Sequence, residues 1–314
     1  MIRFASLRAS RDRAITPRKD GSDVESDHKL ERHLAYQPSI PFDQTASGYN
    51  GRLNSSPATQ ASALAEYGNE LERDRAYQPA IPYYHAATEH PAFQRLSPAA
   101  QASALIGLGH AVGGTPSHRD YAWAIDAYKR GINHAGFLVL PPGRQAGAYV
   151  GLGRAYRGAV KFDDSIATYQ FGINHRGFKD LSPDWQADVY IGLGQALERA
   201  GRPKWEAMLA YRDGIAHSGF QTLPPERRAH ANFLLGHALV RDRDYSSAIA
   251  AYSDGLQHCG YQNLSPAEGG KVFAGLACAK RGLNEAKHGA AATADSLSPR
   301  RPPSVPKGAR GMGR

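Results

Sequence analysis

Apolar residues recur at steps of three and four along most of the chain, which is the periodicity of an α-helix with one buried face. One set of such segments reads "QASALIGLGHAV" (101–112), "QAGAYVGLGRAY" (145–156), "QADVYIGLGQAL" (186–197) and "AHANFLLGHALV" (229–240). A second set alternates with it and reads "DYAWAIDAYKRGINH" (120–134), "KFDDSIATYQFGINH" (161–175) and "DYSSAIAAYSDGLQH" (244–258). The pattern predicts first and second helices in alternation, and so an all-α fold.

A Leu-x-Pro marker, preceded by an aromatic residue, sets the period of this alternation. Its leucines are Leu96, Leu140, Leu181, Leu223 and Leu264, which are 44, 41, 42 and 41 residues apart, and Leu53 extends the series backward by 43. A fixed period of this length is typical of a stacked array of helix pairs. One helix of about 14 residues is marginal alone in water. Each pair is therefore expected to bury its apolar face against the next.

The same marker predicts where the helices begin and end. Proline is favoured at the first helical position and serine just before it, so Ser97, Ser182 and Ser265 are expected to be N-caps. The second helices end in His-x-Gly-Phe/Tyr, where the glycine is expected to take the left-handed conformation. The segment "KVFAGLACAKRGL" (271–283) is expected to be the closing cap helix.

Two nearly identical octamers, "AYQPSIPF" (35–42) and "AYQPAIPY" (76–83), stand 41 residues apart. That separation equals the repeat period, so we interpret 76–83 as the start of a second helix and 35–42 as its counterpart in a degenerate copy. A duplicated binding epitope is the alternative.

Composition adds three restrictions. The net charge is +9, but residues 1–28 carry +1 and residues 284–314 carry +4, so the middle is only mildly basic. The two cysteines, Cys259 and Cys278, form no disulfide framework or zinc spacing. No apolar run approaches 18 residues, so no membrane segment or membrane partner is expected.

The two ends differ from the repeats. Residues 1–28 are polar and Arg-rich, and we expect a disordered leader, with an organelle transit peptide or a bacterial export signal as alternatives. Residues 284–314 are rich in Pro, Gly and Arg and are expected to form a disordered tail. The repeat domain is then 29–283. A cytoplasmic protein is expected, with export through the leader left open.

The repeat resembles the tetratricopeptide repeat (TPR). In one first helix the framework is Tyr149, Leu152, Gly153 and Tyr156, and in the following second helix it is Ser165, Tyr169 and Gly172. The resemblance covers about five repeats, a degenerate N-terminal half-repeat and a cap helix, and it implies a right-handed α-solenoid. The period of 41–44 residues exceeds the family's repeat of about 34. Glycine also replaces the family's alanine at 131, 172, 214 and 255, which predicts close helix contact.

Two patterns that suggest other chemistry have structural explanations. The segment "GLGHAVG" (107–113) is a loose nucleotide-fold match, but its glycines fall inside a helix, where packing explains them. One histidine per unit, at 90, 134, 175, 217 and 258, suggests a metal ladder. Neighbouring units lie about 10 Å apart, which is too far for shared zinc ligands. A cap on the last carbonyls is expected instead.

The resemblance to TPR arrays implies a concave groove, lined by first helices, that holds a partner's peptide. Two residues past the framework leucine position lie Asn69, His110, Arg154, Gln195 and His237. A turn further lie Arg73, Arg157, Arg199, Arg241 and Arg281. A column of guanidinium groups can bind carboxylates, so an acidic peptide or C-terminus is the expected ligand. The alternative is a solvated helix face whose arginines bind no ligand.

The function predicted is a protein-interaction scaffold or adaptor. A secreted bacterial effector that uses the array as an adaptor is one alternative, and a helical-repeat nucleic-acid binder is another. The framework tyrosines do not occupy groove positions, so nucleic acid is not the expected partner. No catalytic pattern, metal or cofactor is predicted, and the chain is not expected to be an enzyme.

Overall fold

The structure is a computed structural model that describes residues 56–115 and 120–297. Every regular element in these ranges is helical, which confirms the predicted all-α fold. The chain divides into two compact units, Met1–Leu138 and Val139–Arg314. The leader (1–28), the octamer at 35–42 and the end of the tail (298–314) lie outside the described residues.

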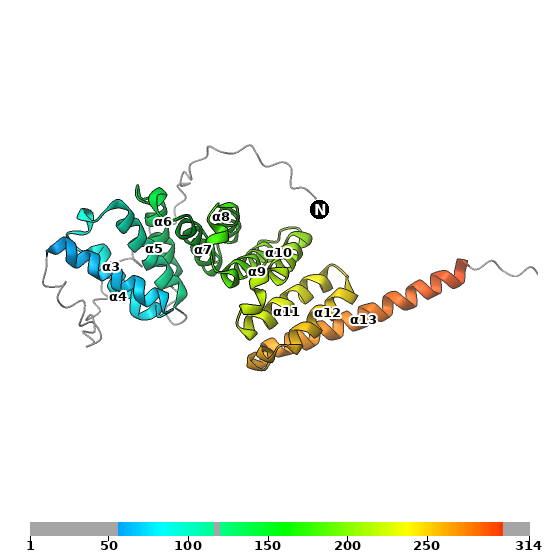
Figure 1. The fold of residues 1–314 in the computed structure, drawn as a ribbon. Helices are drawn as coiled ribbons and strands as arrows, with labels where there is room; N and C mark the ends of the chain where they lie inside the picture. The colour runs from blue at the N-terminus through cyan, green and yellow to red at the C-terminus, as the bar shows by residue number, and fades with distance from the viewer. Residues whose placement is uncertain (1–55, 116–119, 298–314) are drawn as a thin grey trace, which may run out of the picture. The chain divides into compact units, whose positions relative to one another are not determined.

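The described part of the first unit is built from two helix pairs. They are α3 (Pro57–Arg73) with α4 (Tyr77–Glu89), and α5 (Pro98–Gly114) with α6 (Tyr121–Asn133). The 3₁₀ turn η2 (Phe93–Arg95) joins α4 to α5, and η3 (Phe137–Val139) contains the boundary between the units. The second octamer begins α4, as predicted. Helix α4 packs against both α3 and α5 (Figure 1), so the two pairs are stacked.

The second unit continues the alternation from α7 to α13. Its helices are α7 (Pro142–Gly158), α8 (Phe162–Asn174), α9 (Pro183–Arg199), α10 (Lys204–Ala216), α11 (Pro225–Arg241), α12 (Tyr245–Gln257) and α13 (Pro266–Leu297). The turns η4 (Phe178–Asp180), η5 (Ser218–Thr222) and η6 (Cys259–Asn263) precede α9, α11 and α13. Helices α9, α11 and α13 each pack against the second helix of the preceding pair. This confirms the stacked helix pairs, and the right-handed superhelix stays a prediction.

Every described first helix begins at the expected proline. The Ser97 hydroxyl accepts a hydrogen bond from the Ala100 amide at 3.2 Å, as an N-cap should. Ser265 and Glu268 cap each other reciprocally, because the serine hydroxyl accepts from the Glu268 amide and the glutamate accepts from the Ser265 amide. Ser182 is the N-cap residue of α9, as predicted, but its side chain makes no cap hydrogen bond.

The glycines of the His-x-Gly-Phe/Tyr turns were predicted to take the left-handed conformation, and this prediction was wrong. Gly177 has φ −86°, and among the described glycines only Gly201 has a positive φ. A Cβ atom on Gly177 would instead lie 2.0 Å from the carbonyl oxygen of Pro142, and one on Gly219 would lie 1.9 Å from that of Pro183. Glycine is needed because the turn presses against the start of the first helix of its own pair.

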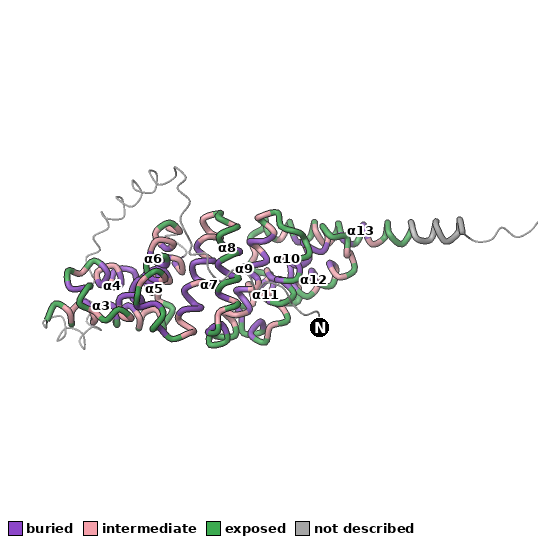
Figure 2. Tube along the Cα trace, turned by 90° about the horizontal axis from the view of Figure 1, so that it is seen from above, coloured by how far each residue is buried: buried purple, intermediate pink, exposed green. Residues whose placement is uncertain are grey.

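Glycine also lets the framework tyrosines enter between first helices. A Cβ atom on Gly153 of α7 would lie 2.9 Å from the Tyr169 ring, and one on Gly192 of α9 would lie 2.8 Å from the Tyr169 hydroxyl oxygen. The ring therefore fills a notch between two consecutive pairs. Figure 2 shows buried residues along the sides where helices meet. Tight helix contact thus explains these glycines, as expected for the related pattern at 107–113.

The glycines that replace the family's alanine have the same role. A Cβ atom on Gly172 would lie 2.9 Å from Val150, and one on Gly214 would lie 2.9 Å from Ile191. Both are contacts from a second helix to the first helix of its own pair. The predicted close helix contact is confirmed.

The last helix is longer than predicted. Helix α13 runs to Leu297, so residues 284–297 continue the helix instead of beginning an unstructured tail. No second helix follows α13 in the described part of the chain, and Phe273 on its outer side is 57% exposed. Tyr190 occupies the corresponding position of α9. The centre of its ring lies 6.2 Å from that of His217, which follows α10, the second helix of the same pair. Helix α13 thus ends the array with a partly uncovered face.

Val160 offers a test of backbone strain. It has φ +63° in the turn between α7 and α8 and is 65% exposed. A β-branched residue is rarely found in this region, and the conformation costs about 1–2 kcal/mol. We therefore expect Val160→Gly to raise the free energy of unfolding by about 1 kcal/mol, measured by urea denaturation.

Gly201 in the next turn provides the matched control. It has φ +69° and a Cβ atom there would meet nothing within 4 Å, so Gly201→Val should lower stability through the backbone alone. Equal stabilities for the wild type and both variants would contradict strain at Val160.

Candidate protein-interaction surface

The first helices of the second unit bring six polar side chains together. They are Arg154, Arg157, Asp188, Gln195, Arg227 and His230, here named the first-helix face. Residues three or seven apart on a helix share one side. Helix periodicity therefore aligns Arg154 with Arg157 on α7, Asp188 with Gln195 on α9, and Arg227 with His230 on α11. Contacts then run from α7 across α9 to α11.

The first line of contacts is an ion-pair triad. The Nη2 of Arg154 donates to the Oδ2 of Asp188 at 2.8 Å, and Arg227 donates to the other oxygen of the same carboxylate. Burial alone would raise the pKa of Asp188, but the charges of Arg227 and Arg154 hold that pKa below its ordinary value. The carboxylate is therefore ionised at neutral pH and links three consecutive first helices.

The second line is a directed hydrogen-bond chain. Arg157 donates from Nη1 to the side-chain oxygen of Gln195, and the Gln195 amide donates to the Nε2 of His230 at 3.3 Å. Because Nε2 accepts, the His230 proton is on Nδ1 and the ring is neutral. Burial lowers the pKa of His230, and the charge of Arg227 lowers it further, while Glu268 acts in the opposite direction.

The two lines form one electrostatic cluster with an excess of positive charge. Arg157 lowers the pKa of both Asp188 and His230, so its charge reaches both lines. The face holds three guanidinium groups and one carboxylate, a formal balance of +2 when His230 is neutral. Arg154 and Arg227 are 43% and 35% exposed, so part of this charge faces solvent.

Other predicted groove residues in the second unit lie elsewhere. Arg241 pairs with Glu198, whose carboxylate also accepts from the Tyr211 hydroxyl at 2.8 Å. The Nδ1 of His237 lies 2.7 Å from the Tyr252 hydroxyl, inside the array. Burial lowers the pKa of His237. These two residues brace neighbouring helices and are not part of the first-helix face.

The predicted arginine column is wrong as a single column. Arg157 follows its framework leucine by five residues, whereas Arg199 and Arg241 follow theirs by six. One residue turns a helix by about 100°, so the two positions point in different directions. The Arg199 guanidinium accordingly lies 5.8 Å from the centre of the Phe162 ring on α8. Arg281 is exposed on α13.

In the first unit the predicted residues surround a carboxylate. The Tyr84 hydroxyl lies 3.0 Å from the Asn69 oxygen and 2.6 Å from the Glu72 carboxylate, which also lies 2.8 Å from the Nδ1 of His110. Arg73 is exposed. Glu72 thus lies at the centre of this network, and among the described residues the first-helix face lies in the second unit.

Sequence reasoning missed three members of the first-helix face. Asp188 and His230 stand seven residues before the predicted positions Gln195 and His237, so a step back of two helical turns would have found them. No sequence pattern predicted Arg227, because it belongs to the face only through its ion pair with Asp188 on another helix.

The histidine column serves the turns between pairs. The Nδ1 atoms of His134 and His175 accept from the amides of Gly136 and Gly177 at 3.1 Å. We predicted that these rings would donate to the last carbonyl groups of the helix. Their Nδ1 atoms instead accept from an amide of the turn that follows. In the described ranges, no group of three His, Cys, Asp or Glu could hold a metal ion.

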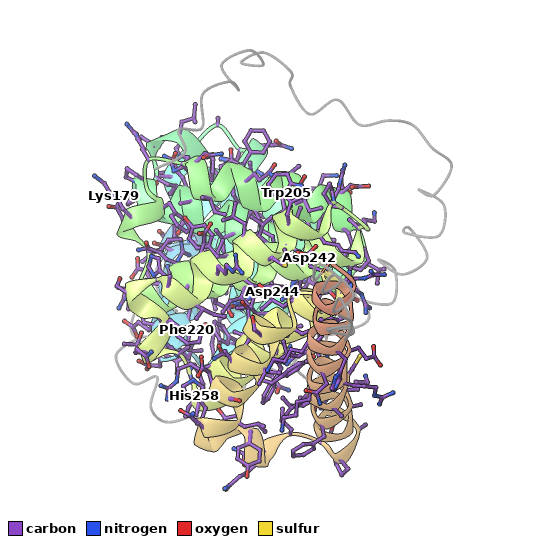
Figure 3. The ribbon with its side chains drawn as sticks, turned by 90° about the vertical axis from the view of Figure 1, so that its right-hand side faces the viewer. Lys179, Trp205, Phe220, Asp242, Asp244 and His258 are labelled. Carbon is purple, nitrogen blue, oxygen red and sulfur yellow. The ribbon has the colours of Figure 1, made fainter. Side chains whose placement is uncertain are left out.

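The labelled residues of Figure 3 show which end of the pairs these turns occupy. His258 and Phe220 lie at one end, with ring centres 6.4 Å apart, while Asp242 and Asp244 lie at the other. The Asp244 carboxylate accepts from the Ser247 amide and caps α12 there. The turn at His258 therefore lies at the end of its helix pair opposite to the Asp244 cap.

His175 predicts acid sensitivity of the fold. Burial and the charge of Arg176 lower the pKa of His175, and a protonated ring can no longer accept at Nδ1. The unfolded chain then binds protons at a pH where the folded chain does not, so stability is complete above about pH 6.5 and falls as the pH falls below it. We expect the urea midpoint to drop between pH 7.5 and pH 5.

His175→Asn is the matched variant, since its oxygen can accept from the turn without titrating. It should weaken the pH dependence and lower the midpoint at pH 7.5, because the contact of 3.1 Å between the Nε2 of His175 and the side-chain oxygen of Gln145 is lost. An identical pH profile for both proteins would contradict a role for this ring.

Comparisons with known proteins give matches among solved structures. No family model matches the chain, and no curated protein matches it. Among solved structures, one similar chain comes from Podospora anserina and is described as a kinesin light chain with nearly identical TPR-like repeats. It covers 67% of this chain and 100% of its own length, with a TM-score of 0.47 and 14% identity.

The helix pairs define the class of protein. Tyrosine on a second helix packs against the Leu-Gly glycine on the first, and within the units α5, α9, α11 and α13 also pack on the preceding pair. The described part of the chain is a helical-repeat protein built from stacked helix pairs, and its repeat resembles the tetratricopeptide repeat. None of the described helices combines the length and apolar character that a membrane-spanning segment needs.

Proposed function

We propose that the protein is an interaction scaffold whose first-helix face binds an acidic segment of a partner protein. The observation that carries this proposal is that the six side chains of the first-helix face include three arginines and a single carboxylate, a formal balance of +2. Arginine forks form charge-assisted hydrogen bonds with carboxylates, and the side chain of Arg227 is 35% exposed. Repeat arrays create extended binding surfaces, which supports binding as the role of this one.

The buried tyrosines favour a protein partner over nucleic acid. Tyr84, Tyr211 and Tyr252 are each 0% exposed. Single-stranded RNA is held largely by stacking on exposed aromatic rings, and these rings are committed to helix packing. Export as an effector would depend on the leader and is compatible with the same face.

The test is the binding of a fluorescein-labelled hexaglutamate peptide, measured by fluorescence anisotropy. We expect the affinity to fall steeply as KCl rises, because surface charge is screened within about 10 Å at 0.1 M salt. A hexaglutamine peptide of equal length is the control and should not bind. Equal binding of both peptides, or an affinity indifferent to salt, would reject an electrostatic acidic-peptide site.

A further inference from the structure

The charge of the first-helix face is concentrated in a small area. Arg154 and Arg157 are three residues apart, and so are Arg227 and His230, which corresponds to a rise of about 4.5 Å along each helix. On α7 and α11 the two lines of contacts thus lie less than one helical turn apart, whereas on α9 Asp188 and Gln195 are seven residues apart, a rise of about 10.5 Å. The charge of Arg157 nevertheless acts on both Asp188 and His230.

Asp188 does not neutralise the cluster. Its two oxygens are already shared between Arg154 and Arg227, and it is only 10% exposed. Arg157 contacts the neutral Gln195, and no ion pair joins it to a carboxylate among the described residues. Its Nε atom is also buried without an acceptor in this part of the chain. Arg157 is therefore the guanidinium whose charge is least compensated.

We propose that the first-helix face binds a phosphorylated side chain of the partner, seated between the two lines of contacts. A phosphomonoester carries about −1.5 to −2 charges at pH 7 and three strong acceptor oxygens. That charge matches the balance of +2 in one group, whereas a single carboxylate supplies half of it. This inference rests on the proposed function, because it names the chemical group that the same face selects.

The roles of the residues follow from their contacts. Arg157 and Arg227 supply donors from the two outer helices, α7 and α11. Asp188 pairs with both Arg154 and Arg227 across α9 and is a positioning residue. The Gln195 amide fixes the proton of His230 on Nδ1, so this ring can donate one further hydrogen bond.

The experiment compares three short peptides on the full-length protein at constant ionic strength. The peptides share the sequence Gly-Ser-Gly-X-Gly-Ser-Gly, with X as phosphoserine, glutamate or serine, and isothermal titration calorimetry measures their affinities. The phosphoserine peptide should bind at least about tenfold more tightly than the glutamate peptide, as a difference of about one charge in a partly desolvated site implies. Arg157→Gln and Arg227→Gln should each remove most of this preference.

Arg212→Gln is the matched control, because Arg212 is exposed on the second helix α10 and lies outside the face. It should leave all three affinities unchanged. Equal binding of the phosphoserine and glutamate peptides would overturn the phosphate inference and leave the acidic-peptide proposal in place. Phosphoserine binding that persists in both face variants would also overturn it, since the anion would then bind elsewhere.

Discussion

Replacing Tyr211 with alanine is expected to destabilise the second unit by about 3–5 kcal/mol, because an aromatic side chain is removed from a closed core. The ring is fully buried, and a Cβ atom on Gly194 of α9 would lie 2.6 Å from it. Glycine at 194 leaves no side chain that could fill the cavity. Urea denaturation followed by circular dichroism at 222 nm measures the loss.

Tyr211→Phe separates the ring from its hydroxyl group. The hydroxyl donates to Glu198 at 2.8 Å, and burial raises the pKa of Tyr211, so it stays a neutral donor. Phenylalanine keeps the ring and loses this bond, which should cost about 1 kcal/mol. Similar losses for the two variants would contradict the view that the tyrosine ring holds neighbouring helices together.

Reversing two charges on the first-helix face is expected to abolish binding of the hexaglutamate peptide. Arg157→Glu combined with Arg227→Glu changes the balance of the face from +2 to −2. Attraction becomes repulsion, and the affinity should fall by about 100-fold or more, as seen when close charge pairs at interfaces are disrupted. Fluorescence anisotropy with the same peptide gives the result.

A second pair of reversals controls for total charge. Arg212 and Arg243 are exposed and lie on α10 and in the turn after α11, away from the face. Arg212→Glu with Arg243→Glu changes the net charge by the same amount and should lower the affinity only slightly. Thermal unfolding of both variants verifies that the fold is kept. Equal losses from the two pairs would mean that overall charge, and not the face, attracts the peptide.

Much of the fold could be predicted because repetition multiplies weak local signals. Helix starts at Pro98, Pro142 and Pro183 follow from a marker that recurs with the period of the array. Glycine was harder to interpret, since the sequence does not distinguish a positive φ from a close approach. Gly177 looked like a left-handed cap, but the carbonyl group of Pro142 explains it. The end of α13 was missed because no recurring marker follows it.

The candidate site could be predicted only in part, because side-chain direction depends on single-residue register. Arg154, Arg157 and Gln195 were found by position relative to the framework leucine, and the structure places them in one cluster. Arg199 was misplaced because a shift of one residue turns its side chain toward Phe162. Asp188 contacts arginines on two other helices, and contacts between helices cannot be predicted from the periodicity of one helix.

The most direct measurement of the central claim is site-specific photocrosslinking of the binding partner. A benzophenone amino acid at position 195 on the first-helix face is compared with the same residue at position 212 on α10, in the full-length chain with the hexaglutamate peptide or a captured partner. The account predicts a covalent product from position 195 and none from position 212. A product from position 212 with none from position 195 would contradict it, because the ligand would then lie on the second helices.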